Sequence, residues 1–321
     1  MSNQVLIIGL GQIGMGYDLS LDLEKAVYTH ARAFILHPAF DLVGAVDPSA
    51  VQRSLFQNHY NQPAYPDIES ALQAINPTVV VIASPTAMHS DVLHKVLIHC
   101  RPKVILCEKP LAYELEEASR MLTACESAGV KLFVNYMRRA DLGAIEVKKR
   151  IESGSIATPV KGIVWYSKGF LHNGSHFFNL LEFWLGACIS AKVLDAGRLW
   201  DNQDPEPDVR VVFERGTVVF QSAWEEAFSH YTIELLSPSG RLRYEQGGEY
   251  IIWNSIHSDP NFSGYSILQA KPEVIVNSMD RYQWNVVDQL ADVLAEKPHT
   301  LCTGCQALAT LEALYQIINE I

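Results

Sequence analysis

The chain has 321 residues, of which 48% are hydrophobic, and it carries a formal net charge of −11. This length suits two domains, each large enough for its own hydrophobic core. The negative charge argues against a nucleic-acid partner, because clustered lysine and arginine make the phosphate contacts in such complexes. No apolar run approaches the about 18 residues needed to cross a bilayer, and the N-terminus lacks the basic region of a secretory signal. We therefore expect a cytoplasmic protein with no membrane partner.

The N-terminal segment has the pattern of a dinucleotide-binding turn. An apolar strand, residues 5–8, runs directly into Gly9-Leu10-Gly11-Gln12-Ile13-Gly14. Glycines in this position allow a tight turn and bring backbone amides close to a pyrophosphate. A plain glycine turn is the alternative, but the strand before the turn favours a binding site. The pattern assigns cofactor contacts to Gly9, Gly11, Gln12, Ile13 and Gly14.

A second predicted strand, residues 41–47, ends at Asp47. A carboxylate at this strand end can accept hydrogen bonds from both hydroxyls of a ribose and repel a 2′-phosphate, so we expect NAD as the cofactor rather than NADP. The separation of 38 residues between Gly9 and Asp47 (47 − 9) exceeds the about 20 that are usual, so residues 15–29 are an insertion. We expect this insertion to be a long surface loop; a lip over the cofactor is the alternative.

The next two strands also end in polar residues. Residues 78–83 are followed by Ser84-Pro85-Thr86 and by His89 at the start of a helix, and residues 104–107 are followed by Glu108-Lys109-Pro110. Ligands bind beyond the carboxyl ends of strands in open parallel sheets, so Glu108 and Lys109 are expected where cofactor and substrate meet. A surface ion pair is the alternative. With a helix predicted over residues 114–128 and a strand over 131–134, the alternation predicts an α/β fold, a doubly wound parallel sheet over residues 1–135.

After residue 135 the pattern changes to short strands separated by turns of hairpin length. It predicts an α+β domain over residues 136–321 with a large, mainly antiparallel open sheet. A polar loop is predicted over residues 201–208. Strands are predicted at residues 160–166, 209–213, 217–224, 231–236, 241–245 and 250–253, and helices at 142–151, 280–296 and 305–318.

The segment 168–176 precedes an amphipathic helix and contains two histidines. Ser175 is the predicted N-cap, so His176 falls in the first helical turn, where the helix dipole disfavours a protonated imidazole. A neutral His176 is suited to act as a general base, and a purely structural histidine is the alternative. His172 and His176 have a spacing found in metal sites, but Gly174 would break the helix that aligns them, so we expect no metal.

Over essentially its whole length the chain resembles the glucose–fructose oxidoreductase, inositol dehydrogenase and MocA (Gfo/Idh/MocA) family. The resemblance rests on the glycine turn, Asp47, the segment from Ser84 to His89 and a histidine opening a helix, and its most specific feature is Glu108-Lys109-Pro110. It implies a Rossmann domain followed by a substrate-binding and oligomerisation domain, with a homodimer or homotetramer formed through the C-terminal sheet.

The resemblance also implies roles for individual residues. The family's active lysine corresponds to Lys109, its catalytic histidine to His176, and the glutamate that contacts the cofactor ribose to Glu108. Further contacts with the cofactor are implied for Ser84, Pro85, Thr86, His89 and Asn135, and contacts with the substrate for Lys109, Arg138, Lys168, His172, His176 and Asn179.

Two positions depart from family members that oxidise free polyols: His172 and Asn179 stand where those members often carry aspartates. The segment 168–176 looks more like the family's surface-polysaccharide branch, which implies a sugar or nucleotide-sugar substrate. The resulting hypothesis is hydride transfer between the nicotinamide and a secondary alcohol or ketone of that substrate. A catalytically silent sensor that binds the dinucleotide and a sugar is the alternative, because fold does not fix function. An oxidoreductase that never releases its NAD is a third reading.

Overall fold

The computed structural model describes residues 2–22, 26–225 and 227–321. They divide into two compact units: residues 1–140 with 280–309, and residues 141–279 with 310–321. The chain therefore leaves the first unit after residue 140 and returns to it at residue 280. Within the predicted insertion, residues 23–25 lie outside the described residues. None of the helices that the structure describes has the length and apolar character of a membrane-spanning segment.

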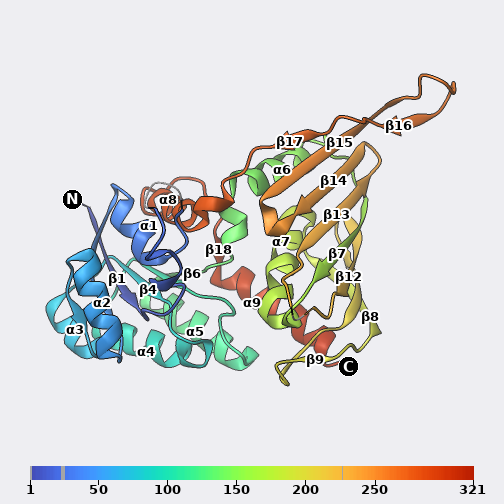
Figure 1. Cartoon of the computed structure of the whole chain (residues 1–321). Helices are drawn as coiled ribbons and strands as arrows, with labels where there is room; N and C mark the ends of the chain where they lie inside the picture. Colours follow the sequence, from blue (N-terminus) through green and yellow to red (C-terminus); the bar gives the residue numbers. More distant parts are fainter. Residues whose placement is uncertain (1, 23–25, 226) are drawn as a thin grey trace. The chain divides into compact units, whose positions relative to one another are not determined.

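The first unit contains a seven-stranded sheet with the order β18-β6-β5-β4-β1-β2-β3. Figure 1 labels β1, β4, β6 and β18 of this sheet. All neighbouring strands are parallel except β18, which is antiparallel to β6. Strands β4 and β5 are buried along their whole length, as expected for apolar runs covered on both faces. This confirms the predicted doubly wound α/β fold. The strands are β1 (Asn3–Ile8), β2 (Phe40–Val46), β3 (Ala64–Tyr65), β4 (Val79–Ile82), β5 (Val104–Cys107), β6 (Lys131–Val134) and β18 (Cys302–Thr303).

Helices connect these strands and complete the core of the first unit. Gly129, which directly follows the last residue of α5, has a left-handed backbone, with φ 68°. Helix α8 comes from the C-terminal part of the chain, and its Val286, Val287 and Leu290 join the same hydrophobic core as α1. The helices are α1 (His30–Leu36), α2 (Ala50–Tyr60), α3 (Ile68–Ala74), α4 (His89–His99), α5 (Leu115–Ala128) and α8 (Tyr282–Leu294).

Strand β1 lies between β2 and β4, and the order of strands reverses there. The chain runs outward from β1 to β2 and β3 on one side, and from β4 to β5 and β6 on the other. Open α/β sheets bind ligands beyond the carboxyl ends of the strands at such a reversal. Because β1, β2, β4 and β5 are parallel, the polar residues that follow them are all at this edge of the sheet.

The second unit contains a nine-stranded sheet with the order β16-β15-β14-β13-β7-β12-β11-β8, in which β17 also pairs with β15 (Figure 1). Its neighbouring strands are antiparallel except β7 and β12, which confirms the predicted, mainly antiparallel sheet. Strands β8, β16 and β17 were not predicted. The strands are β7 (Val160–Tyr166), β8 (Cys188–Asp195), β11 (Asp208–Phe213), β12 (Gly216–Ser222), β13 (Thr232–Ser237), β14 (Gly240–Glu245), β15 (Tyr250–Ser258), β16 (Ser266–Leu268) and β17 (Glu273–Ile275).

The core of the second unit lies between this sheet and three helices. Helices α6 (Leu142–Glu152) and α7 (Ser175–Leu185) contribute apolar side chains to it, together with the end of α9 (Gly304–Ile318). Trp184 of α7 is fully buried, and its indole Nε1 donates a hydrogen bond to the carbonyl oxygen of Ala144 at 2.9 Å. A short pair, β9 (Leu199–Trp200) with β10 (Asp204–Pro205), occupies part of the predicted polar loop.

The start of α7 differs from the prediction. Ser175 does not cap the helix, because the helical backbone continues upstream through a π-helix over Gly169–Gly174. Gly174 itself is helical, with φ −54° and ψ −37°. The argument that Gly174 breaks the helix is therefore wrong, and His172 lies on the same helical stretch as His176. The helix-dipole argument applies to the start of the π-helix rather than to His176.

Candidate functional site

A cavity of about 890 Å³ opens at the carboxyl ends of β1, β2 and β4, and all of its lining residues belong to the first unit. It lies at the edge where the strand order reverses. Of the predicted cofactor residues, the cavity is lined by Gly9, Gly11, Gln12, Ile13, Asp47, Ser84 and Pro85. It is also lined by residues that the sequence did not single out as ligands, among them Tyr17, Asp67, Met88, Asp91 and Lys95.

The three glycines of the turn have three different environments. Gly9 has φ 102°, and a Cβ there would lie 2.6 Å from the carbonyl carbon of Ala83, so only glycine fits. A Cβ on Gly14 would lie 2.2 Å from the carbonyl oxygen of Gly9, so the start of the helical turn packs directly on the loop. A Cβ on Gly11 would meet no atom within 4 Å. The space over Gly11 faces the cavity, as the close approach of a pyrophosphate requires.

Asp47 is fixed at the end of β2 by backbone amides. Its Oδ2 accepts a hydrogen bond from the amide of Leu10, and its Oδ1 accepts one from the amide of Ser49, both at 2.8 Å. Arg53 donates from Nη1 to the carbonyl oxygen of Asp47, also at 2.8 Å. The carboxylate therefore stands in the cavity wall next to the glycine turn, where a ribose of a bound dinucleotide would lie.

His89, at the start of α4, joins the segments that follow β4 and β5. It is fully buried, with Nε2 2.9 Å from the carbonyl oxygen of Ser84 and Nδ1 3.1 Å from that of Pro110. Burial lowers the pKa of His89, and the nearby carbonyl oxygens only partly oppose this. The ring contacts the main chain of both segments, so it holds the loop with Ser84 against the loop after Lys109.

Glu108 follows β5, and its carboxylate is held by two side chains. His30 Nε2 lies 2.8 Å, and Asn135 Nδ2 2.7 Å, from Glu108 Oε1. Gln283 joins both of these partners: its Nε2 lies 2.8 Å from His30 Nδ1, and its Oε1 accepts a hydrogen bond from Asn135 at 3.2 Å. Burial by itself raises the pKa of Glu108, but the hydrogen bonds from His30 and Asn135 outweigh it and hold this pKa below its ordinary value. Glu108 is therefore an anion at neutral pH.

His30 and Gln283 were missed by the sequence analysis. His30 is the first residue of α1, and the insertion separates it from the glycine turn in the sequence. Gln283 lies 148 residues after Asn135, and no local pattern connects the two. Lys109 follows Glu108 directly, and its backbone amide donates to Glu108 Oε2 at 3.3 Å.

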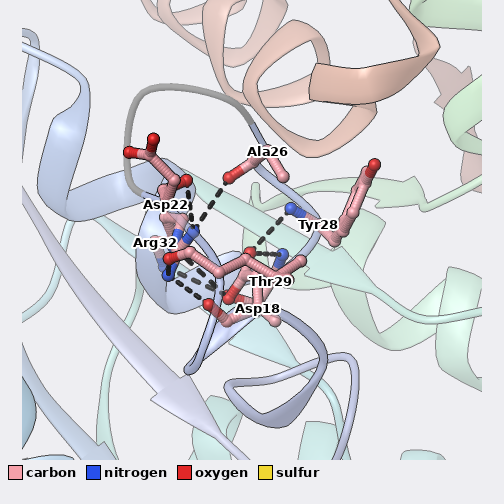
Figure 2. Close-up of polar contacts among 7 residues, drawn as sticks. Asp18, Asp22, Ala26, Tyr28, Thr29 and Arg32 are labelled. Carbon is pink, nitrogen blue, oxygen red and sulfur yellow. Dashed lines mark hydrogen bonds and ion pairs between the residues drawn. The ribbon is translucent and has the colours of Figure 1, made fainter.

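The described part of the insertion is held by a buried ion pair (Figure 2). Asp18 and Arg32 are both fully buried, with Arg32 Nε 3.5 Å from Asp18 Oδ1. Asp18 Oδ2 accepts hydrogen bonds from the amides of Tyr28 and Thr29 at 2.7 and 2.9 Å. The described part of this segment is therefore a loop anchored by a buried ion pair, and Tyr17 of the same segment lines the cavity. Arg32 donates to the backbone carbonyl oxygens of Asp18, Leu21, Asp22 and Ala26.

In the second unit, the segment 168–176 is anchored by two buried carboxylates. Glu206 Oε1 accepts a hydrogen bond from the amide of Lys168, and Asp204 Oδ2 accepts one from the amide of His172, both at 2.7 Å. Burial raises the pKa of Asp204, and the hydrogen bonds from backbone amides oppose this rise. The predicted polar loop that contains both acids is thus partly buried, because its carboxylates satisfy amides at the start of the π-helix.

The predicted substrate residues of this unit differ in exposure. His172 is exposed and stacks on Trp200 with ring centroids 5.1 Å apart, and His176 is half-buried. Asn179 is 1% exposed and donates to Thr310 Oγ1 at 3.0 Å, so its amide group is engaged inside the unit. Lys168 has φ 65°, and its Nζ lies 2.9 Å from Ser229 Oγ.

Arg138 belongs to the first unit, where it is half-buried in the 3₁₀-helix Met137–Ala140 after β6. Within the ranges that the structure describes, no group of three or more His, Cys, Asp or Glu side chains has the arrangement of a metal site.

Residues 4–136 match the model of the oxidoreductase family with an NAD-binding Rossmann fold, GFO_IDH_MocA. This stretch contains the glycine turn, Asp47 and Glu108-Lys109-Pro110. Residues 4–136 belong to the Gfo/Idh/MocA family. The predicted family is thereby confirmed over these residues, and the family is described as NAD-binding.

Known Gfo/Idh/MocA relatives and solved structures resemble the chain to different extents. The scyllo-inositol 2-dehydrogenase (NAD(+)) of Bacillus subtilis (strain 168) is 28% identical over 229 residues, which cover 63% of this chain and 60% of that protein. The chain thus spans less than two thirds of this relative. A solved structure from Desulfitobacterium hafniense DCB-2, with the provisional name NADPH-dependent oxidoreductase, has a TM-score of 0.82 at 18% identity and covers 100% of this chain and 96% of that one.

The WlbA dehydrogenase of Bordetella pertussis, solved in complex with NADH and UDP-GlcNAcA, has a TM-score of 0.77 at 18% identity. The match covers 100% of this chain and 97% of that one. At such identities the likeness shows the shared fold, and it extends over both units of the chain.

Proposed function

We propose that the protein is an NAD(P)-dependent oxidoreductase that transfers a hydride between the nicotinamide and a secondary alcohol or ketone of a sugar or nucleotide-sugar. The observation that carries the proposal is the cavity at the reversal of strand order, with the glycine turn and Asp47 in its wall, together with Glu108 and Lys109, which directly follow the nearby strand β5. The names of relatives support the substrate class, since one acts on scyllo-inositol and another was crystallised with NADH and UDP-GlcNAcA.

Two residues carry the proposed chemistry. Lys109 donates a hydrogen bond to the reacting oxygen and stabilises the negative charge that develops on it. His176 exchanges the proton of the substrate hydroxyl as a general base. A bound dinucleotide would accept or donate the hydride, and Arg138, Lys168 and His172 are the proposed substrate contacts, whereas Asn179 is buried and hydrogen-bonded to Thr310.

The test first assays the wild type on a panel of sugars and nucleotide-sugars, with the change in NADH absorbance as the readout. Variants are then assayed on the substrate that this panel identifies. We expect Lys109→Met and His176→Ala each to lower kcat by about 100-fold or more, with the Kd for NADH changed little. Lys131→Ala, which removes an exposed lysine at the start of β6, is the control and should keep wild-type turnover. Unchanged turnover in Lys109→Met would overturn the assigned role. Binding of NADH without turnover of any panel member would favour the silent sensor.

We further propose that the sheet of the second unit joins copies of this chain into a homodimer or homotetramer. Exposed apolar side chains on its strands support this, among them Trp165, Leu194, Leu236 and Val274. Light scattering after size exclusion should show an oligomer for the wild type and a smaller species for Leu236→Glu. A wild-type monomer at micromolar concentration would contradict the proposal.

A further inference from the structure

Glu108, His30, Gln283 and Asn135 form a closed ring of hydrogen bonds within the first unit. The four contacts measure 2.8 Å from Glu108 to His30, 2.8 Å from His30 to Gln283, 3.2 Å from Gln283 to Asn135 and 2.7 Å from Asn135 to Glu108. His30 is fully buried, as is Gln283, and Asn135 is 3% exposed. Three of the four side chains in the ring are therefore shielded from solvent.

The ring has one consistent arrangement of donors and acceptors. Asn135 Nδ2 donates both of its hydrogens, one to the Glu108 carboxylate and one to Gln283 Oε1. Gln283 Oε1 is thus the acceptor, so Gln283 Nε2 is the donor toward His30 Nδ1. His30 Nδ1 accepts, and its proton is on Nε2, directed at Glu108 Oε1. Each side chain fixes the orientation of the next.

This arrangement leaves particular atoms available to a ligand. Glu108 Oε1 receives two side-chain hydrogen bonds, whereas Oε2 receives only the long contact from the Lys109 amide among the described residues. The Glu108 side chain is 12% exposed. Asn135 Oδ1 is buried and accepts no hydrogen bond in the part of the chain that the structure describes, and turning the amide round would aim this oxygen at the carboxylate. Such a buried acceptor is stabilised when a ligand supplies a donor.

The topology says which part of a dinucleotide meets Glu108. Asp47 and the glycine turn lie at the ends of β2 and β1, so the cavity takes the adenosine half and the pyrophosphate. Strand β5 lies on the other side of β1, beyond β4. Residues at its carboxyl end therefore face the nicotinamide half.

We propose that His30 and Gln283 are positioning residues that hold the Glu108 carboxylate, through Oε1, in the orientation in which Oε2 accepts hydrogen bonds from the ribose of the nicotinamide half. This inference rests on the proposed function only in requiring that the protein bind a nicotinamide dinucleotide. Neither residue touches the cofactor; both act through Glu108. Loss of either contact frees the carboxylate to rotate, and binding of the nicotinamide half is weakened while that of the adenosine half is not.

Two matched substitutions of His30 separate the effect of its hydrogen-bond donor from the effect of the size of its imidazole. The amide nitrogen of a glutamine reaches about as far as the histidine Nε2, whereas that of an asparagine reaches about as far as Nδ1. His30→Gln therefore keeps a donor for Glu108, and His30→Asn does not. Gln283→Met removes both polar atoms of the glutamine while keeping a similar volume.

The test measures the Kd values of NADH and of ADP by titration calorimetry with the full-length protein. We expect His30→Asn and Gln283→Met to weaken NADH about ten-fold and ADP by less than about two-fold, with His30→Gln close to wild type for both nucleotides. Unchanged NADH binding in His30→Asn and Gln283→Met would overturn the inference. So would a parallel loss of NADH and ADP binding, which is the result of damage to the fold.

The measurement needs no sugar substrate, so the two proposals fail in different ways. A wild-type protein that binds no NADH would overturn both the proposed function and the positioning role. A wild-type protein that binds NADH as tightly as all three variants do would overturn the positioning role alone.

Discussion

The carboxylate of Asp47 accepts a hydrogen bond from the backbone amide of Leu10 at 2.8 Å, across 37 residues of sequence. This contact ties the end of β2 to the glycine turn and keeps a negative charge in the wall of the cavity. Arg53 lies beside the charge and donates to the carbonyl oxygens of Asp47 and Pro48, both at 2.8 Å. The carboxylate repels the 2′-phosphate of NADP and the guanidinium attracts it, so these two residues influence the preference between NAD and NADP.

We expect Asp47→Ser to shift the ratio of the Kd values for NADH and NADPH about ten-fold or more toward NADPH. The substitution removes the charge that repels a 2′-phosphate and leaves the Arg53 guanidinium to attract it. Fluorescence titration with each nucleotide measures the ratio. Asp91→Asn is the control, since it removes the same charge from another residue that lines the cavity. An equal shift in both variants would contradict a specific role for Asp47.

Two substitutions in the glycine turn should separate the affinity for NADH from the thermal stability of the protein. Gly11→Ala adds a methyl group into open space, so we expect an unchanged Tm and a Kd for NADH weakened by about ten-fold or more, because the methyl group obstructs the pyrophosphate. Gly14→Ala places its methyl group 2.2 Å from the carbonyl oxygen of Gly9, so its Tm should fall. Differential scanning fluorimetry and nucleotide titration check both variants. Tight NADH binding by Gly11→Ala would show that the pyrophosphate lies elsewhere.

The ion pair of Asp18 with Arg32 predicts coupled losses of stability. Both side chains are fully buried, so removing one leaves the other as an uncompensated charge. We expect Asp18→Asn and Arg32→Met each to lower the free energy of unfolding by about 3 kcal/mol, and the double variant to lose less than the sum of the two. Urea denaturation measures all three values.

An exposed pair serves as the control for this cycle. Asp91 and Lys95 approach to 2.8 Å on α4, with 58% and 50% of their side chains exposed. Asp91→Asn should change the free energy of unfolding by less than about 0.5 kcal/mol. Strict additivity in the Asp18 and Arg32 cycle would mean that the two charges do not interact in the folded protein.

His89 predicts a loss of stability at mildly acidic pH. Burial lowers its pKa in the folded protein, so below the ordinary histidine value of 6.5 the unfolded chain binds a proton that the folded chain does not. Stability from this site is therefore complete above that pH and is lost as the pH falls toward the lowered pKa. The Tm of the wild type should drop more between pH 7.5 and pH 5.5, about one unit on either side of that value, than the Tm of His89→Gln does. Identical drops would assign the acid sensitivity to other groups.

The sequence by itself determined the features that depend on neighbouring residues. Apolar runs and helical periodicity located β1, β2, β4, β5 and β6 and the helices α4 and α5, because burial on one or both faces leaves a local pattern, whereas α2 and α3 were not predicted. The turn glycines and Asp47 could be recognised for the same reason, since each stands at a strand end that the pattern predicts. The family resemblance drew on these local motifs, and the match to residues 4–136 confirms it.

Only the tertiary structure decided how distant residues are paired. His30 and Glu108 are 78 residues apart, and Gln283 reaches His30 across 253 residues because α8 returns to the first unit. In the same way, the sequence places Asp204 and Glu206 only in a predicted polar loop. The structure shows that their carboxylates accept hydrogen bonds from amides at the start of the π-helix. Periodicity reports whether a side chain faces the core, whereas the partner of a buried polar group is set by packing between elements that are remote in the chain.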